Sequence, residues 1–520
     1  MQKAEKEQLS QEQEQEQEQE QKADPPIPKI IPLWKDFTYF AHQLDGIKWM
    51  LEKEIHGTVV PTRNYSSTLT IRGGFQCDDM GLGKTIQIAS VIFNHPLQST
   101  LILAPLAMID TWSSVCKRMG VRVYEVDGDW KCMNDPAGAI PKRFIKTRRP
   151  SVYITNFEKV YFNPSLFRKE WDRVVLDEAH KIRNGDSRVA VAARKLVAPI
   201  RWAVTGTPLV NSYKDIVSLM AFIGVPYSPL WKWEPRYLEI LPNVVIHRSL
   251  NSLRNVIEGA PPVPKIHEVI LPFTTKEEEE FYYGVQGTRE ELLSKYAKEQ
   301  LNNAAMFTLL LRLRQISVHP QVYINAKRRE ATKQGISYER ENWNHLCTKF
   351  EEIRRIIQND KKDPEVHKYI IFCQFNEEID ILGSFLINEG LTTNVLMYNG
   401  SMNQKERTAV LKESKESTEN TVLLLQLQAG GVGLNLQEYD RVVFMSPWWT
   451  SALMDQAIAR AVRMGQTKVV HVYHLKLQAE NESSINIDSL INDAADQKRI
   501  MLENLFAICE GVQEPVQEQK

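Results

Sequence analysis

Short runs of apolar, often β-branched residues alternate with helical patterns along most of this 520-residue chain. The alternation predicts parallel sheets covered by helices on both faces, which is the α/β class. The expected strands are residues 100–104, 151–155, 173–177, 201–205, 368–373, 393–398, 421–427, 441–446 and 469–475. Between the two groups of strands the pattern becomes helical, so we expect two α/β halves with a helical piece between them.

Composition shifts suggest where these parts begin and end. Residues 1–32 comprise a Gln/Glu-rich tail, which has no apolar positions to bury and is expected to be disordered, and a proline-rich linker. The first α/β half is assigned to 33–258 and the second to 346–515. The helical region between them, 259–345, opens at the break APPVPK.

Bulk properties exclude some functions. The net charge of −1 gives no general attraction to nucleic acid, so any such binding needs a local groove. The six cysteines form no C-x-x-C pair and have no His partner at zinc spacing, which argues against a zinc module and for a reducing compartment. With no signal peptide and no apolar run long enough to span a bilayer, we expect a soluble intracellular protein.

The stretch DDMGLGKTIQ, residues 78–87, is a candidate phosphate-binding loop. Gly81 and Gly83 let successive backbone N–H groups point at phosphate oxygens, and a helix starting near Lys84 adds its positive end. Lys84 is expected to reach the β- and γ-phosphates, and the Thr85 hydroxyl to ligate Mg²⁺. Asp78 stands where the strict motif has glycine, so a glycine-rich turn without nucleotide stays open on this stretch alone.

An acidic pair supports the nucleotide interpretation. In RVVLDEAHKIRN, residues 173–184, an apolar strand ends in Asp177 and Glu178. Ligands of parallel α/β sheets bind at this edge of the strands. Asp177 can hold Mg²⁺, and Glu178 can orient or deprotonate an attacking water.

Two arginines three residues apart stand in DQAIARAVRMGQ, residues 455–466. The spacing places Arg460 and Arg463 on one face of a helix, and Gly465 is a plausible stop for that helix. An arginine pair can be a solvated basic face or can be aimed at a phosphate bound elsewhere. The phosphate loop favours the second interpretation.

Five motifs occur in the order of the helicase superfamily 2 motor: DDMGLGKT, DEAHKIRN, TGTPLVN, LQAGGVGLNL and DQAIARAVRMGQ. The chain resembles the Swi/Snf-related family of chromatin-remodelling and DNA-repair ATPases over roughly residues 33–475. That family normally has Asp at the position of Asp78. The resemblance implies two RecA-like lobes, which are parallel sheets flanked by helices, with a helical insertion between them and ATP in the cleft.

The resemblance also implies roles for individual residues. Lys84, Glu178, Arg460 and Arg463 are the expected catalytic residues, the two arginines reaching the γ-phosphate from lobe 2 when the cleft closes. Gln43, in FAHQLDGIKWM, is expected to recognise adenine, and Gln456 and Gln466 to position the arginine helix or the nucleotide. The expected ATP and Mg²⁺ residues are Gln43, Asp79, Met80, Gly81, Leu82, Gly83, Lys84, Thr85, Asp177 and Gln456, with Thr85 and Asp177 as the metal ligands.

In the family, loops that follow strands contact the DNA backbone, so the resemblance implies DNA contacts on such loops here. The residues assigned to them are Pro105, Thr205, Gly206, Gly430, Gly431 and Trp449. Trp449 can equally be a core residue. Gln428 replaces the small hydroxyl residue of the family, and Thr450 and Ser451 replace its Asn-Pro pair, so coupling between DNA and ATP can be tuned differently here. Arg312, Arg314 and His319 are expected at the lobe interface.

The resemblance implies an ATP-driven translocase on double-stranded DNA that remodels or displaces bound proteins such as nucleosomes or transcription factors, with no membrane partner. Two alternatives stay open, a strand-separating DNA or RNA helicase and an ATPase-inactive nucleic-acid-binding scaffold. The scaffold is disfavoured because the expected catalytic residues are intact. The resemblance implies a nuclear location, or a cytoplasmic viral factory or virion if the chain is virus-encoded.

Overall fold

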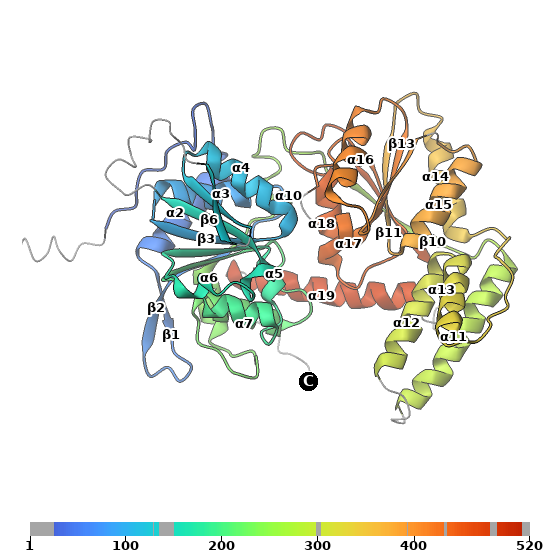
Figure 1. Cartoon of the computed structure of the whole chain (residues 1–520), viewed down its shortest axis with the longest axis horizontal. Coiled ribbons are helices and arrows are strands. Elements are labelled where there is room, and N and C mark those ends of the chain that lie inside the picture. Colours follow the sequence, from blue (N-terminus) through green and yellow to red (C-terminus); the bar gives the residue numbers. More distant parts are fainter. Residues whose placement is uncertain are drawn as a thin grey trace, which may run out of the picture. The chain divides into compact units, whose positions relative to one another are not determined.

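The computed structural model describes residues 25–127, 129–134, 150–297, 303–392, 394–430, 434–478 and 486–511. The chain divides into two compact units, which are labelled by element in Figure 1. Unit 1 is Met1–Leu250 with Asn504–Lys520, and unit 2 is Asn251–Glu503. The Gln/Glu repeat lies outside the described residues. No helix among the described residues has both the length and the apolar character needed to cross a membrane.

Unit 1 is built on a nine-stranded sheet of order β1-β2-β8-β7-β3-β6-β4-β5, with β9 paired to β2. The pairs β1–β2 and β4–β5 are antiparallel, and the other pairs are parallel. The strands are β1 Thr58–Pro61, β2 Thr68–Gln76, β3 Ser99–Ala104, β4 Arg122–Asp127, β5 Asp129–Asn134, β6 Ser151–Asn156, β7 Arg173–Asp177, β8 Ile200–Val204 and β9 Val245–Ile246.

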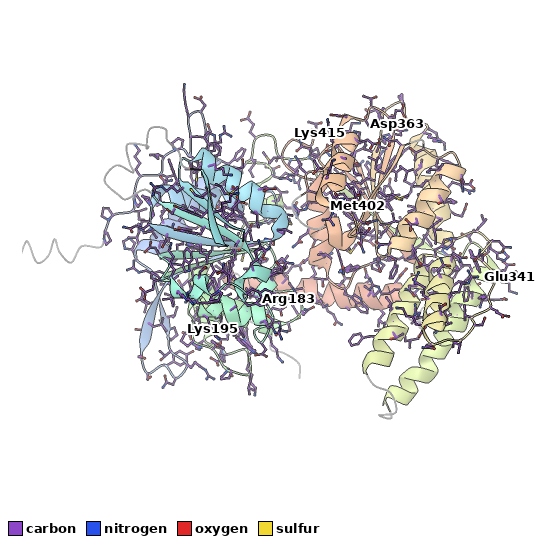
Figure 2. The ribbon with its side chains drawn as sticks, viewed as in Figure 1. Arg183, Lys195, Glu341, Asp363, Met402 and Lys415 are labelled. Carbon is purple, nitrogen blue, oxygen red and sulfur yellow. The ribbon has the colours of Figure 1, made fainter. Side chains whose placement is uncertain are left out.

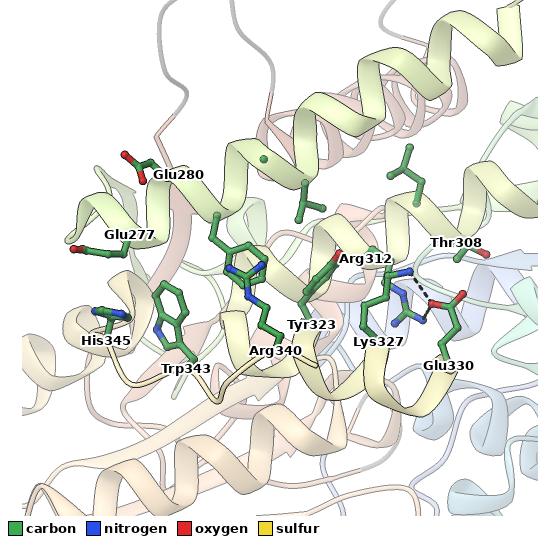
Figure 3. Close-up of a pocket in the computed structure, with 14 residues that line it drawn as sticks. Glu277, Glu280, Thr308, Arg312, Tyr323, Lys327, Glu330, Arg340, Trp343 and His345 are labelled. Carbon is green, nitrogen blue, oxygen red and sulfur yellow. Dashed lines mark hydrogen bonds and ion pairs between the residues drawn. The ribbon is translucent and has the colours of Figure 1, made fainter. Parts of the chain in front are cut away.

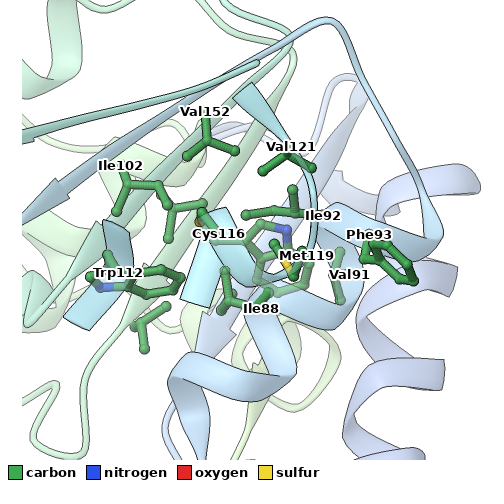
Figure 4. Packing of buried hydrophobic residues seen from close by; sticks show 14 of the residues in the cluster. Ile88, Val91, Ile92, Phe93, Ile102, Trp112, Cys116, Met119, Val121 and Val152 are labelled. Atoms are coloured by element: carbon green, nitrogen blue, oxygen red, sulfur yellow. The ribbon is translucent and has the colours of Figure 1, made fainter. Parts of the chain in front are cut away.

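Helices cover both faces of this sheet, as Figure 1 shows. They are α2 Ala41–Ile55, α3 Lys84–Asn94, α4 Ile109–Arg118, α5 Phe157–Val160, α6 Ser165–Arg168, α7 Arg188–Lys195, α8 Tyr213–Ile223 and α9 Tyr237–Val244. A short helix, α10 Leu250–Leu253, stands at the point in the chain where unit 1 ends and unit 2 begins. Two 3₁₀ turns, η1 Leu106–Met108 and η3 Ala179–Ile182, follow β3 and β7. Figure 4 shows α3 and α4 packed on the sheet, with Trp112 and Cys116 beside Ile102.

The four strands expected in unit 1 are confirmed as β3, β6, β7 and β8. The sequence did not predict β2, the strand that leads into the phosphate loop. Gly73 allows β2 to pair with β8, and as a glycine it also weakens the β-branched pattern by which a strand is recognised in the sequence. A Cβ there would lie 2.0 Å from the Arg201 carbonyl oxygen of β8, so only glycine allows the two strands to pair.

Glu54 is a fully buried carboxylate between α2 and the sheet. Its oxygens accept hydrogen bonds from Arg173 Nε at 2.6 Å and Nη2 at 2.5 Å, from Trp202 Nε1 at 2.8 Å and from His95 Nδ1 at 2.6 Å. Burial alone would raise the pKa of Glu54, but Arg173 and His95 outweigh it and hold the pKa below its ordinary value.

We expect Glu54→Ala to lower the free energy of unfolding of unit 1 by about 3–5 kcal/mol, because it leaves the Arg173 guanidinium buried and unpaired. Urea unfolding followed by tryptophan fluorescence measures the loss. Glu52→Ala, at an exposed position of the same helix, is the matched control and should change the unfolding free energy little. Equal shifts for the two variants would contradict this account.

Unit 2 contains a parallel six-stranded sheet of order β10-β15-β14-β11-β13-β12. Its strands are β10 Lys265–Leu271, β11 Lys368–Cys373, β12 Asn394–Tyr398, β13 Thr421–Gln426, β14 Arg441–Phe444 and β15 His471–Leu477. Its helices are α11 Lys276–Ala297, α12 Asn303–Val318, α13 Pro320–Lys333, α14 Thr348–Asp360, α15 Asn376–Asn388, α16 Gln404–Glu416, α17 Leu427–Gly430, α18 Ser451–Ala461 and α19 Ile487–Cys509, whose last residues group with unit 1. Figure 2 labels Met402 and Lys415 near the two ends of α16. All five predicted strands of this half are confirmed.

The region assigned as helical and lying between the two halves, 259–345, contains more than helices. It contributes β10, an edge strand of the second sheet, and its helices α11–α13 belong to unit 2. A shared apolar cluster joins them to the sheet, since Phe281 and Leu313 pack with Leu477 and Ile487. The helical piece is therefore part of the second compact unit.

A pocket of about 1000 Å³ lies among α11, α12, α13 and the segment that carries Trp343. Figure 3 shows Arg312 and Lys327 beside Glu330, with Arg312 Nη2 and Glu330 Oε2 3.1 Å apart. Arg312, expected at the lobe interface, therefore lines this pocket. Apart from Arg312, the described lining includes no residue to which the sequence assigned a role.

His319 has a structural role at the start of α13. Its Nδ1 accepts a hydrogen bond from the Gln321 backbone N–H at 3.0 Å and so caps the helix. Burial lowers the pKa of His319 from its ordinary 6.5 to about 4, which keeps the ring neutral as the cap requires.

This capping predicts a pH dependence of stability in unit 2. Between pH 6.5 and about 4 the unfolded chain binds a proton at His319 that the folded chain does not. The free energy of unfolding should therefore fall as pH decreases through this window, by up to about 1.4 kcal/mol per pH unit. Thermal midpoints of unfolding, measured at a series of pH values across this range, test the predicted loss of stability. His319→Asn keeps a capping side chain without a titrating group and should flatten the profile.

Candidate functional site

The phosphate loop lies where the sequence places it, between β2 and α3. Gly81 and Gly83 have φ of 91° and 80°, in the left-handed region that favours glycine. Gly83 is also closely approached, because a Cβ there would lie 2.5 Å from Gln43 Nε2. The loop thus needs glycine for its conformation, while a side chain at position 83 would also displace the end of the Gln43 side chain on α2.

Asp78, the departure from the strict motif, is fully buried. Its carboxylate accepts hydrogen bonds from Gln76 Nε2 at 2.6 Å, from Gln87 Nε2 at 2.9 Å and from Arg248 Nε at 2.9 Å. Arg248 also donates to Gln87 Oε1 at 2.9 Å and to the His42 carbonyl oxygen. The aspartate therefore ties the start of the loop to α3, α2 and the segment after β9, which glycine could not do.

Lys84 is the first residue of α3, and Thr85 follows it in the same turn. The Lys84 ammonium donates to the carbonyl oxygens of Asp78 at 2.7 Å and Asp79 at 3.3 Å, across the mouth of the loop. A Cβ on Gly206 would lie 3.5 Å from Lys84 Nζ. The phosphate loop and the TGT loop after β8 therefore meet at this lysine.

Asp177 ends β7, and its carboxyl group is almost completely buried. Its Oδ2 accepts a hydrogen bond from Trp112 Nε1 at 2.7 Å, and its Oδ1 accepts one from the Glu178 backbone N–H at 3.1 Å. Burial, with the neighbouring Glu178 carboxylate, raises the pKa of Asp177 to about 7, although Trp112 and Lys84 oppose the rise. A cation bound here would favour the charged form.

Glu178 has φ 54° and ψ 53°, a left-handed conformation that non-glycine residues rarely adopt. Strained residues of this kind cluster at functional sites. Its Oε2 lies 3.4 Å from His180 Nδ1, and the same nitrogen lies 3.1 Å from Thr205 Oγ1. His180 thus connects the acidic pair to the TGT loop. Arg183, labelled in Figure 2, donates to the His180 carbonyl oxygen at 3.4 Å.

Gln43 lies in the first turn of α2, against the phosphate loop. Its Oε1 accepts from the Phe40 backbone N–H at 3.2 Å, and its Nε2 donates to the Leu82 carbonyl oxygen at 3.4 Å. His42 Nε2 contacts the same carbonyl oxygen at 3.1 Å. This places Gln43 beside the loop, and its recognition of adenine stays a prediction.

The predicted residues of unit 1 gather at one edge of the sheet. The strands β2, β8, β7 and β3 are neighbours and parallel, so their carboxyl ends lie side by side. They lead respectively into the phosphate loop, Thr205–Gly206, Asp177–Glu178 and Pro105. Thr205 is 1% exposed and Pro105 is buried, whereas Leu106 beside it is 70% exposed. The DNA contacts of this edge stay predictions.

In unit 2 the predicted residues also follow the carboxyl ends of strands. Gly430 ends α17, directly after β13, while Gly431 lies outside the described residues. Trp449 follows β14 and packs, half-buried, with the cluster of Phe281, Leu313 and Ile487. This packing fits the core interpretation of Trp449, and its DNA contact stays a prediction.

The arginine helix differs from the prediction. α18 ends at Ala461, so Arg460 lies on the helix but Arg463 lies in the turn that follows. Arg460 is 7% exposed, and Arg463 Nη1 donates to the Leu434 carbonyl oxygen at 3.4 Å. The helix ends early because Gln466, buried below the turn, donates to the carbonyl oxygens of Gln437 at 2.8 Å and Tyr439 at 2.9 Å, which pulls the chain away from the helical path.

Gln456 lies buried on α18, as does Arg460 one turn further on. Gln466 has a positioning contact within its own unit, and a nucleotide contact of either glutamine stays a prediction. Arg314, expected at the lobe interface, donates to Gln374 Oε1 at the end of β11 and lies 4.9 Å from the ring centre of Trp448.

Sequence reasoning missed several residues that hold the site. His180 stands inside the recognised stretch RVVLDEAHKIRN, so that motif could have indicated it, whereas Trp112 lies 65 residues from Asp177 in the chain. Arg248 has no such signal, because it is 170 residues from Asp78 in the chain. Gln374 follows a predicted buried strand, which is the position at which parallel sheets present functional side chains.

The acidic edge fits a magnesium ion by its chemistry. Asp177 offers carboxylate oxygen and Thr85 a hydroxyl, which are the hard oxygen ligands that Mg²⁺ takes alongside nucleotide phosphates. Burial and the neighbouring Glu178 carboxylate raise the pKa of Asp177, and a cation bound at this edge would oppose that rise. Among those residues no cluster of three or more His, Cys, Asp or Glu side chains forms a separate metal site.

Comparisons with known proteins match nearly the whole folded chain. The SNF2-related domain matches residues 42–322, and the helicase conserved C-terminal domain matches 348–465. The chain is 27% identical to the probable global transactivator of Orgyia pseudotsugata multicapsid polyhedrosis virus, over 89% of this chain and 91% of that protein. It is 24% identical to the DNA repair protein RAD5 of Yarrowia lipolytica, over 77% of this chain and 53% of that protein.

A third relative is the chromodomain-helicase-DNA-binding protein 8 of Danio rerio, 26% identical over 84% of this chain and 18% of that protein. The chain thus spans most of the viral relative but only about half or less of these two cellular ones. Among solved structures, the Sulfolobus solfataricus SWI2/SNF2 ATPase core in complex with dsDNA is 21% identical, with coverage of 93% of this chain and 96% of that chain and a TM-score of 0.37.

Proposed function

Since the chain belongs to the SNF2-related family and is a DNA-dependent ATPase of helicase superfamily 2, we propose that it uses ATP to move along double-stranded DNA and to displace or remodel proteins bound there. The family membership rests on a match to more than half of the chain.

The observation that carries the proposal is the His180 bridge. It joins Glu178, the expected residue for activating water, to Thr205, on the loop expected to contact the DNA backbone, through contacts of 3.4 Å and 3.1 Å. Gly206 of the same loop borders Lys84. If DNA shifts this loop, the positions of the Glu178 carboxylate and the Lys84 ammonium would therefore change. This gives DNA a direct route by which to stimulate ATP hydrolysis.

The residues of unit 1 supply the chemistry in this proposal. The phosphate loop and Lys84 bind the β- and γ-phosphates, Asp177 and Thr85 hold Mg²⁺, and Glu178 orients the attacking water. When bound, Mg²⁺ would neutralise phosphate charge. Trp112 holds the Asp177 carboxylate in place through its hydrogen bond of 2.7 Å.

The residues of unit 2 would complete the site. We propose that Arg460 and Arg463 reach the γ-phosphate when the two units close on ATP, which ties hydrolysis to movement. Gly430 and Trp449 would then meet DNA on the same unit. A nuclear site of action fits the names of the cellular relatives, and a cytoplasmic viral factory fits the viral one.

The test measures ATP hydrolysis by the purified chain alone and with duplex DNA, single-stranded DNA or RNA. We expect duplex DNA to give the largest stimulation, and the effect to weaken as salt rises because phosphate contacts release counterions. Displacement of a third strand from a triplex then reports translocation without strand separation. Stimulation mainly by RNA or single strands would instead favour a helicase, and no hydrolysis with any of them would favour the scaffold.

A further inference from the structure

We propose that the C-terminal end of α19 positions the nucleotide-binding loop through His247, so that Phe506 and Glu510 set the affinity for ATP without contacting it. The inference rests on the proposed nucleotide site and assigns a role to residues that the family motifs do not include. His247 is a positioning residue here, because it contacts the loop and has no assigned place in the reaction.

The loop is held from behind by the segment that follows β9. The Cys77 backbone N–H donates to the Ile246 carbonyl oxygen at 2.8 Å, and the Asp79 N–H donates to the Arg248 carbonyl oxygen at 3.0 Å. The Leu250 N–H donates in turn to Asp79 Oδ2 at 2.8 Å. Residues 77–79 therefore run alongside residues 246–250, as a continuation of the pairing between β2 and β9.

His247 projects from this segment toward Asp79, with Nε2 and Asp79 Oδ1 3.8 Å apart. The side chain of His247 is 9% exposed, whereas that of Asp79 is 41% exposed, so the contact is closed to solvent on the histidine side only. The Asp79 carbonyl oxygen is one of the two that hold the Lys84 ammonium. A displacement of Asp79 would therefore move the lysine that is expected to bind phosphate.

The C-terminal end of α19 closes over the other side of the ring. Phe506 stacks on His247, with ring centres 3.6 Å apart and planes inclined by 6°. Glu510 Oε1 lies 3.0 Å from His247 Nδ1. Burial alone would lower the pKa of His247, but Asp79 and Glu510 outweigh it and raise the pKa, which strengthens the ion pair on each side of the ring.

These contacts form a chain from Phe506 and Glu510, through His247, to Asp79 and Lys84. Stacking fixes the plane of the imidazole, and the two carboxylates fix its rotation, so His247 has one orientation when all three partners are present. Without Phe506 the ring can turn away from Asp79, and the Asp79 carboxylate then keeps the Leu250 backbone N–H as its partner.

The test compares three variants on this helix in the full chain. Phe506→Ala should raise the Kd for a fluorescent ATP analogue and the KM for ATP by about tenfold, with kcat at saturating ATP within about twofold of wild type. Phe506→Tyr keeps the stacked ring and should restore both values. Ile500→Ala removes an apolar side chain that is 56% exposed on the same helix, and it should leave both values unchanged.

Glu510→Gln is a second test that does not put folding at risk, because the Glu510 side chain is 50% exposed. It should give a smaller rise in KM, about twofold, with an unchanged thermal midpoint. If the wild type hydrolyses ATP and Phe506→Ala leaves Kd and KM within twofold of wild type, the positioning role is overturned while the proposed function stands. If the wild type binds no nucleotide, both are overturned.

Discussion

Glu178→Gln is expected to slow ATP hydrolysis by about 10²- to 10⁴-fold and to leave the Kd for ATP close to that of the wild type. The amide has the size of the carboxylate, so the left-handed backbone at this position is kept, but it cannot accept a proton from water. Single-turnover hydrolysis with duplex DNA, together with a nucleotide-binding titration, measures the two quantities separately.

The matched control for this variant is Glu170→Gln, which makes the same chemical change at an exposed position of unit 1. It should hydrolyse ATP at the wild-type rate. The prediction also distinguishes the proposed roles of the acidic pair, because Asp177→Asn should weaken the dependence on Mg²⁺ as well as the rate. A Glu178→Gln variant with more than a tenth of the wild-type rate would contradict the assignment of Glu178 as the residue that activates water.

Burial determines which strands could be predicted from the sequence. β3 and β7 are buried at every position, and apart from Ser99, Arg173 and Asp177 their sequences are runs of β-branched and aliphatic residues, which is typical of a strand covered on both faces. β2 and β10 were missed for opposite reasons. β2 contains Gly73, which allows close packing but interrupts the apolar run. β10 is an edge strand that is mostly exposed, so after the APPVPK break its sequence has no buried apolar run to mark it as a strand.

In the candidate site, residues in contiguous motifs could be predicted, whereas their partners from distant parts of the chain could not. The phosphate loop and the Asp177–Glu178 pair are contiguous stretches whose chemistry is visible in a few residues. The groups that hold them come from far along the chain, such as Arg248 on Asp78, Trp112 on Asp177 and His247 on Asp79. No periodicity or spacing links residues 79 and 247, so only the fold could bring them together.

The end of α18 lies earlier in the chain than the predicted helix stop at Gly465. Gly465 has φ 97° and does mark a turn, but the helix stops four residues earlier, at Ala461. The cause is the side chain of Gln466, which bonds to the carbonyl oxygens of Gln437 and Tyr439 and so directs the turn. Arg463 is consequently carried by a turn, and only Arg460 keeps the helical position that the spacing predicted.

Arg460→Lys and Arg463→Lys are each expected to lower kcat for DNA-stimulated hydrolysis by about 10²- to 10³-fold, with a change in the Kd for ATP of less than about fivefold. Lysine keeps the positive charge but has no planar fork with which to bridge phosphate oxygens. The effect should therefore appear in the transition state, where charge develops on the γ-phosphate, more than in binding. Steady-state kinetics and a binding titration separate the two.

The two arginines should also differ from each other. Arg460 is 7% exposed on a helix, so its replacement is expected to lower the thermal midpoint of the chain slightly as well as kcat, whereas Arg463, in the turn, should affect kcat alone. Arg355→Lys, at a side chain that is 65% exposed in unit 2, is the control and should change neither. Because both arginines belong to unit 2 and the phosphate loop belongs to unit 1, a loss of kcat in both variants would mean that hydrolysis requires both units on one nucleotide. Wild-type kcat in both variants would mean that unit 1 hydrolyses ATP with its own residues.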